Sequence, residues 1–152
     1  MATQIPARSA SKYCGQYAGA FDAQRIIEIF GDSHRIALSS KNPETAGDRF
    51  ALAVEAYHQI MSMDVPNDVR ASVQNAMQAL ADTFPTQVVA NEALGLREKA
   101  HKLKTPRKRL ELLRRALEVV DRGRAANPGS AMIEQTAAEL RSEIAQSEAA
   151  IT

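Results

Sequence analysis

The sequence is poor in cysteine, histidine and aromatic side chains. Its 152 residues include one cysteine, three histidines and no tryptophan, and aromatic residues make up 5%. A single cysteine excludes an internal disulfide, and with so few histidines a structural zinc site is not expected. The sequence also contains no P-loop and no dinucleotide-binding fingerprint. We therefore expect neither a metal nor another cofactor.

Long apolar runs are also missing. No stretch of 18 consecutive apolar residues is present, which excludes a membrane-spanning helix. Residues 1–19 lack the apolar run of a signal peptide. Hydrophobic residues make up 45% and charged residues 24%, which is typical of a globular protein. We therefore expect a soluble cytoplasmic protein, with residues 1–19 as a flexible N-terminal arm and residues 20–152 as a single helical domain.

The apolar residues recur at steps of three and four, which is the spacing of one helix face. Five segments show this pattern clearly. Residues 21–30 form a further apolar element, helix or strand, that we expect to end at Gly31-Asp32. Because the links are short, the prediction is an all-α fold of five to six antiparallel helices, as a bundle or a stack of hairpins. The five segments are 44–61, 67–83, 86–104, 107–125 and 130–147.

Prolines mark the predicted breaks between these helices. Pro85 separates residues 67–83 from residues 86–104, because proline lacks a backbone donor and disfavours a helix interior. Thr105-Pro106 has the composition of an N-cap followed by proline at the first helical position. The helix predicted after it is apolar around more than half of its circumference, so we expect it to lie centrally.

The segment ALEVVDRGRAANPGS, residues 116–130, resembles the second helix and exit turn of a tetratricopeptide repeat. Ala116, Val120, Gly123 and Pro128 stand where that family has a small, a bulky, a small and a proline residue. The resemblance covers about a quarter of the chain. It implies an architecture of stacked helical hairpins.

The segment IIEIFGDSHRIAL, residues 26–38, resembles the nucleophile block of GDSL-type hydrolases, in which Gly-Asp-Ser follows a buried strand. The resemblance implies Ser33 as the nucleophile and Asp32 as its neighbour. The family also requires a downstream Asp-x-x-His to supply a base, and this sequence has none. A serine without a base is a poor nucleophile at neutral pH. We therefore expect no enzyme, with Gly31 ending one element and Asp32 or Ser33 capping the next.

Positive charge is concentrated in one part of a nearly neutral chain. The whole chain has 19 basic and 18 acidic residues, whereas residues 97–115 hold nine basic and two acidic ones. Arg107, Lys108 and Arg109 occupy the first turn of a predicted helix, where the macrodipole opposes each cation by about 0.3–1 kcal/mol. The unpaired N–H groups of such a turn favour an anion. This combination is typical of an anion-binding site.

We name this predicted site the basic corner. Three anions could bind it: an acidic partner protein, the chain's own last helix with Glu134, Glu139, Glu143 and Glu148, or nucleic-acid phosphate. Alternatively the cations form a solvated helix face, with Glu111–Arg115 and Glu118–Arg122 pairs absorbing part of the charge. The residues of the basic corner are Lys99, Lys102, Lys104, Arg107, Lys108 and Arg109.

Two functions follow from this sequence. The first is a non-enzymatic interaction or assembly module that binds an acidic protein, and that could also associate with itself. The second is a small helical protein, or ribonucleoprotein subunit, that binds the nucleic-acid backbone. Residues 85–152 contain no Phe, Tyr or Trp, which disfavours stacking on single-stranded bases.

Overall fold

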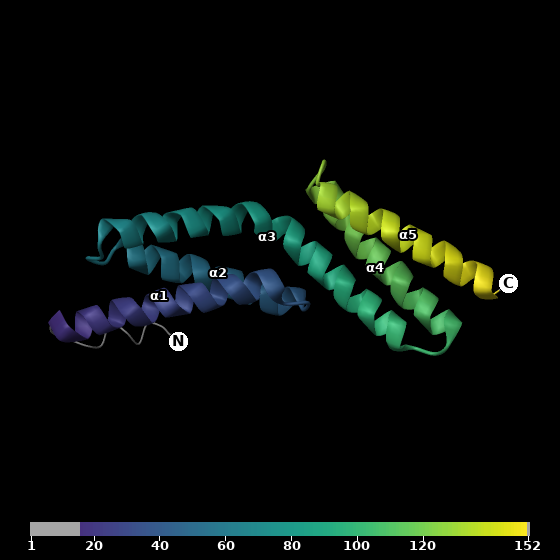
Figure 1. Cartoon of the computed structure of the whole chain (residues 1–152), viewed down its shortest axis with the longest axis horizontal. Helices are drawn as coiled ribbons and strands as arrows, with labels where there is room; N and C mark the ends of the chain where they lie inside the picture. Colours follow the sequence, from purple (N-terminus) through teal and green to yellow (C-terminus); the bar gives the residue numbers. More distant parts are fainter. Residues whose placement is uncertain (1–15, 152) are drawn as a thin grey trace.

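The structure, a computed structural model, describes the backbone of residues 16–151 and the side chains from Asp22 onward. These residues form five α-helices and no strand, so the predicted all-α class is confirmed. None of the described helices combines the length and hydrophobicity needed to cross a bilayer. The predicted arm, residues 1–19, lies outside the described residues except for its last four. The helices are α1 (Gln16–Ser39), α2 (Pro43–Met61), α3 (Asn67–Lys102), α4 (Pro106–Ala126) and α5 (Ala131–Ile151) (Figure 1).

The helices pack into two lobes that share α3, as Figure 1 shows. The N-terminal lobe consists of α1, α2 and residues 67–84, and the C-terminal lobe consists of residues 89–102, α4 and α5. Each lobe has its own apolar core, with Ile60 fully buried in the first and Leu113 in the second. Burying such a side chain stabilises the fold by about 1.5–3 kcal/mol. Burial within each lobe therefore holds the helices together.

α1 continues through Gly31-Asp32, where the sequence predicts an end. That prediction is wrong because glycine weakens a helix interior by only about 1 kcal/mol. The residues on either side compensate, since Ile26, Phe30 and Ala37 are all buried in the N-terminal core. Tertiary packing of one face thus outweighs the local break.

The segments predicted as two helices around Pro85 form one helix, α3, of 36 residues. Pro85 is exposed and lies midway along it, and Figure 1 shows that α3 bends near its middle. Proline inside a helix costs about 3 kcal/mol and kinks it. The helix persists because its two halves are each buried in a different core, with Leu80 before the proline and Ala93 after it. The proline therefore bends α3 instead of ending it.

α4 lies against both α3 and α5, in the central position predicted for it. Ala116 and Val120 are fully buried, and Gly123 closely approaches Val89 of α3. Along α4, the small residues Ala116 and Gly123 and the larger Val120 therefore all lie at buried positions. The resemblance to tetratricopeptide repeats itself stays a prediction.

A buried asparagine joins the two lobes. Asn91 of α3 is 8% exposed, and its side-chain amide donates to the Leu38 carbonyl near the end of α1 at 2.8 Å. Gln87 donates to the Asn91 side-chain oxygen at 2.9 Å. Because a buried amide without partners is costly, these bonds favour one placement of the α1–α2 turn against α3.

Candidate anion-binding site

The basic corner forms where α3 ends and α4 begins. Leu103 and Thr105 have extended backbone conformations, and Pro106 is the first residue of α4, so the predicted break at Pro106 is confirmed. Thr105 occupies the N-cap position, but its side chain makes no capping hydrogen bond. The Arg109 N–H donates to the Thr105 carbonyl at 3.0 Å. The first turn of α4 is thus left without the side-chain acceptor that usually satisfies its N–H groups.

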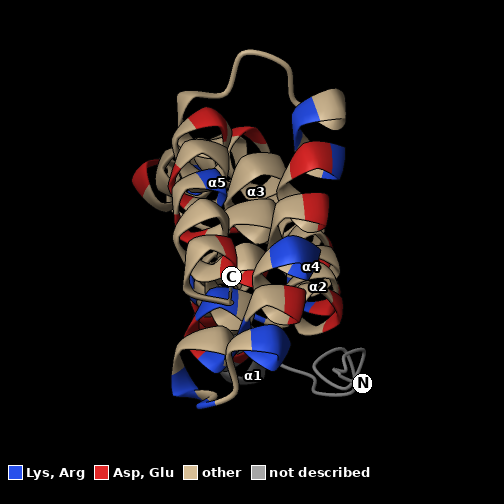
Figure 2. Ribbon diagram, turned by 90° about the vertical axis from the view of Figure 1, so that its right-hand side faces the viewer, with Lys and Arg blue, Asp and Glu red and all other residues tan. Residues whose placement is uncertain are grey.

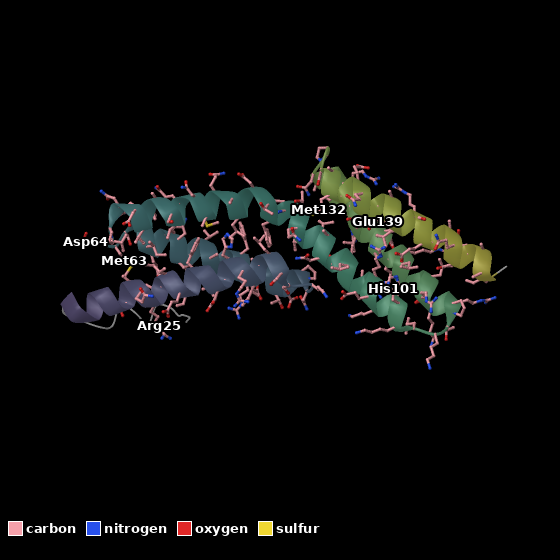
Figure 3. The ribbon with its side chains drawn as sticks, in the orientation of Figure 1. Arg25, Met63, Asp64, His101, Met132 and Glu139 are labelled. Carbon is pink, nitrogen blue, oxygen red and sulfur yellow. The ribbon has the colours of Figure 1, made fainter. Side chains whose placement is uncertain are left out.

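Five of the six predicted cations are exposed at this end of the molecule. Figure 2 shows basic residues at its lower end, where α3 and α4 meet, and Figure 3 shows long side chains projecting from the same turn. None of the five forms an ion pair within residues 16–151. Their charge is therefore available to an external anion. The five are Lys99, Lys102, Lys104, Arg107 and Lys108.

Arg109, the sixth predicted cation, has a structural contact. It is half-buried, and its Nη2 donates to the Leu103 carbonyl at the end of α3 at 2.7 Å. Arg70 makes the equivalent contact at the previous turn, donating to the Met61 and Met63 carbonyls at 2.6 and 2.9 Å. Each arginine is the fourth residue of its helix. This shared position is a sequence signal that could have separated Arg109 from the free cations.

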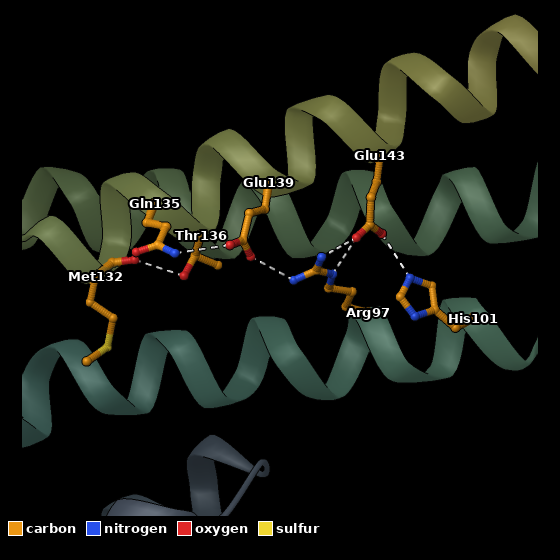
Figure 4. A network of polar contacts seen from close by, with 7 residues as sticks. All are labelled: Arg97, His101, Met132, Gln135, Thr136, Glu139 and Glu143. Atoms are coloured by element: carbon orange, nitrogen blue, oxygen red, sulfur yellow. Dashed lines mark hydrogen bonds and ion pairs between the residues drawn. The ribbon is translucent and has the colours of Figure 1, made fainter.

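The glutamates of α5 form ion pairs with residues outside the basic corner. Glu139 and Glu143 pair with Arg97, and Glu143 also contacts His101 at 2.9 Å (Figure 4). The remaining two pair with arginines of α4: Glu134 with Arg124, and Glu148 with Arg114. The alternative in which α5 is the anion bound by the corner is therefore wrong.

The network around Glu143 changes the protonation behaviour of two groups. Partial burial alone would raise the pKa of Glu143, but hydrogen bonds from Arg97 and His101 outweigh it and hold that pKa below its ordinary value of 4.5. The hydrogen bond to Glu143 in turn raises the pKa of Arg97. Both shifts favour the charged forms, so this network is an ion pair that joins α3 to α5.

The predicted charge pairs along α4 are absent from the described structure. Neither Glu111–Arg115 nor Glu118–Arg122 comes within ion-pair distance in residues 16–151. Exposed i,i+4 pairs contribute only a few tenths of a kcal/mol, which does not fix long side chains in place. In the alternative in which the cations form a solvated helix face, these pairs would neutralise part of the positive charge. Among the described residues they do not form, so that charge is not neutralised in this way.

A cleft of about 370 Å³ extends from the basic corner to the α1–α2 turn. Lys99 and Lys102 line it from α3, and Lys41 lines it from the turn. Lys41 Nζ lies 2.5 Å from the Glu98 carboxylate. This hydrogen bond is the main cause of the lowered pKa of Glu98, and the charges of Lys102 and His101 act in the same direction. Sequence reasoning missed Lys41, because 57 residues separate it from Glu98.

Ser33, the residue resembling a hydrolase nucleophile, lies inside α1 and not after a strand. Its side chain is fully buried, and its hydroxyl has no hydrogen-bond partner. The neighbouring His34 ring packs on Phe30, with ring centroids 6.0 Å apart. The structural context implied by the GDSL resemblance is therefore not found. Cys14, the single thiol, lies outside the described residues.

Among residues 16–151, no three His, Cys, Asp or Glu side chains are grouped so that they could hold a metal ion. Comparison with known proteins adds no relative: no protein-family model, no curated protein and no solved structure matches this chain.

Proposed function

We propose that this protein is a helical interaction module whose basic corner binds an acidic segment of another protein. The observation that carries the proposal is the set of three exposed cations around the α3–α4 turn, Lys104, Arg107 and Lys108. None has a carboxylate partner within the described residues. Cations at a helix N-terminus oppose the macrodipole. An anion bound there interacts favourably with both the cations and the helix end.

The distribution of charge favours a protein partner over nucleic acid. The free cations occupy one tip of an elongated molecule whose net charge is +1. Backbone binding to a duplex depends on neutralising several phosphates along the helix, which a longer basic track serves better. A short acidic peptide needs only a few neighbouring cations, and their field accelerates its encounter with the site.

A binding titration with a matched control tests this proposal. The tip variant replaces Lys104, Arg107 and Lys108 with Gln, and the control variant replaces the exposed Arg25, Arg115 and Arg122 with Gln. Both variants lose three positive charges, so they differ in peptide binding only if the peptide binds at the α3–α4 turn. We expect an oligoglutamate peptide, followed by fluorescence anisotropy at low salt, to bind the tip variant about tenfold more weakly and the control about twofold more weakly.

Circular dichroism of both variants checks that helicity is unchanged. Equal weakening in the two variants would show that binding depends on net charge and not on the corner. A duplex RNA probe separates the alternative function. Binding of RNA with a steep linear fall of log affinity against log salt, together with no peptide binding, would replace the proposal with nucleic-acid binding.

A further inference from the structure

The cleft that extends from the basic corner to the α1–α2 turn has cations on two of its walls. Lys99 and Lys102 stand on α3 without ion-pair partners among the described residues, and Lys41 approaches from the α1–α2 turn. Gly95 forms part of the wall between them, and a Cβ there would lie 3.2 Å from Lys41 Cβ. A side chain at position 95 would therefore crowd Lys41 at the wall of the cleft.

Lys41 already forms an ion pair within the protein, with the carboxylate of Glu98. The two side chains are 49% and 47% exposed, so water and solutes can reach both partners of the pair. Exposed ion pairs contribute little to stability and exchange readily. An incoming carboxylate that replaces Glu98 would form the same type of contact with Lys41. Replacing Glu98 by a peptide carboxylate therefore changes the free energy of the Lys41 contact little. The free lysines Lys99 and Lys102 add favourable contacts for the peptide.

We propose that this cleft binds carboxylates of an acidic peptide through Lys99 and Lys102, and that Glu98 competes with the peptide for Lys41. The inference rests on the proposed function, since it names where the acidic partner lies and how its binding is limited. Glu92 lies in the lining of the same cleft and carries no ion pair within the described residues. Its charge repels acidic groups and favours peptide placement near Lys99 and Lys102.

The dimensions of the cleft suit a peptide. A volume of about 370 Å³ is at the lower end for ligand pockets, enough for a few side chains. Leu96 and Pro43 add apolar surface beside the charged groups, which suits the stem of a glutamate. A nucleic-acid duplex presents its phosphates on a broad, rigid convex surface, whereas the flexible side chains of an acidic peptide can extend into a recess of this size. Acidic side chains are therefore the chemistry that fits.

The decisive experiment removes the competitor. With the oligoglutamate probe, we expect Glu98→Gln to strengthen binding about threefold to fivefold, because Lys41 becomes free. Glu92→Gln removes one negative charge from the same cleft without freeing a lysine, so it should strengthen binding by no more than about twofold. In a Lys41→Gln background, Glu98→Gln should lose its advantage over Glu92→Gln. A gain from Glu98→Gln that persists without Lys41, or no gain at all, would overturn the inference.

A second set of variants separates this inference from the proposed function. We expect the double variant Lys99→Gln and Lys102→Gln to bind the probe about tenfold more weakly than wild type, with unchanged circular dichroism. If the tip variant loses binding while this double variant does not, the peptide binds the turn cations Lys104, Arg107 and Lys108 and not the cleft. If wild type binds no peptide, the proposed function itself fails. Duplex RNA bound in place of the peptide contradicts both.

Discussion

Val89 of α3 occupies the space that a side chain at position 123 of α4 would need. A Cβ added to Gly123 would lie 2.5 Å from Val89 Cγ1 and 2.7 Å from its Cγ2. Carbon atoms do not approach so closely, and the β-branched valine has little freedom to turn away. The two helices therefore touch here because position 123 has no side chain.

We expect Gly123→Ala to lower the free energy of unfolding by about 1–3 kcal/mol, because the added methyl group overpacks the α3–α4 contact. Urea denaturation followed by circular dichroism measures the change. Val89→Ala in the same background should recover part of the loss. The matched control is Gly31→Ala in α1, where a Cβ would meet nothing within 4 Å. That substitution should stabilise the protein by about 0.5–1 kcal/mol, and a loss there would contradict the packing explanation.

The buried hydroxyl of Ser33 gives a second prediction. Ser33 is fully buried and its hydroxyl has no partner, so the hydroxyl loses its hydrogen bonds to water on folding. We expect Ser33→Ala to stabilise the fold by about 1 kcal/mol in urea denaturation. Ser72→Ala, at an exposed position of α3, gives the gain from helix propensity alone. If Ser33→Ala gained no more than Ser72→Ala, the hydroxyl would have a compensating partner.

The fold class could be predicted from the sequence, but two helix boundaries could not. Apolar residues at steps of three and four report directly on buried helix faces, which is why α2 and α4 lie within about one residue of the predicted segments and α5 begins within about one residue of its segment, although it extends beyond the predicted end to Ile151. The predicted breaks at Gly31 and Pro85 were wrong because they are local weaknesses of about 1–3 kcal/mol. Residues on both sides of Gly31 and of Pro85 are buried, and this burial outweighs the local cost. The burial depends on contacts with helices that are distant in sequence.

The same division applies to the candidate site. The helix break at Pro106 and the exposed charges beside it follow from local sequence. The role of Arg109 does not, because its acceptor is a backbone carbonyl of Leu103 whose direction depends on how α3 ends. Lys41 reaches the cleft only through the packing of the α1–α2 turn on α3. Tertiary contacts of this kind leave no periodic trace in the sequence.

The different contacts of Arg107 and Arg109 give a third prediction. Arg109 donates to the Leu103 carbonyl, whereas Arg107 is exposed without an ion pair among the described residues. We expect Arg109→Gln to lower the free energy of unfolding by about 1 kcal/mol. Arg107→Gln should leave it unchanged or raise it slightly, because a cation is removed from a helix N-terminus. Arg107→Gln should weaken peptide binding more than Arg109→Gln does. If Arg107→Gln destabilised the fold more, or Arg109→Gln weakened peptide binding more, the structural role of Arg109 and the binding role of Arg107 would be contradicted.

The lowered pKa of Glu143 predicts how the α3–α5 contact responds to pH. Hydrogen bonds from Arg97 and His101 hold that pKa below 4.5 in the folded chain. The unfolded chain therefore binds the proton more readily. The carboxylate stabilises the fold fully above its unfolded pKa, and this contribution is lost as pH falls through the folded-state pKa.

The test compares wild type with Glu143→Gln by urea denaturation at pH 7 and at pH 3. Because the side chains of Glu143 and Arg97 are only 21% and 26% exposed, we expect the substitution to cost about 1 kcal/mol at pH 7. At pH 3, below the ordinary value of 4.5, the unfolded chain binds the proton, so the carboxylate stabilises the fold less than at pH 7 and the difference between the two proteins should shrink. Glu118→Gln, which removes an exposed carboxylate without an ion pair in the described residues, should have little effect at either pH. A difference for Glu143→Gln that stays constant between the two pH values would mean that its carboxylate charge does not stabilise the α3–α5 contact.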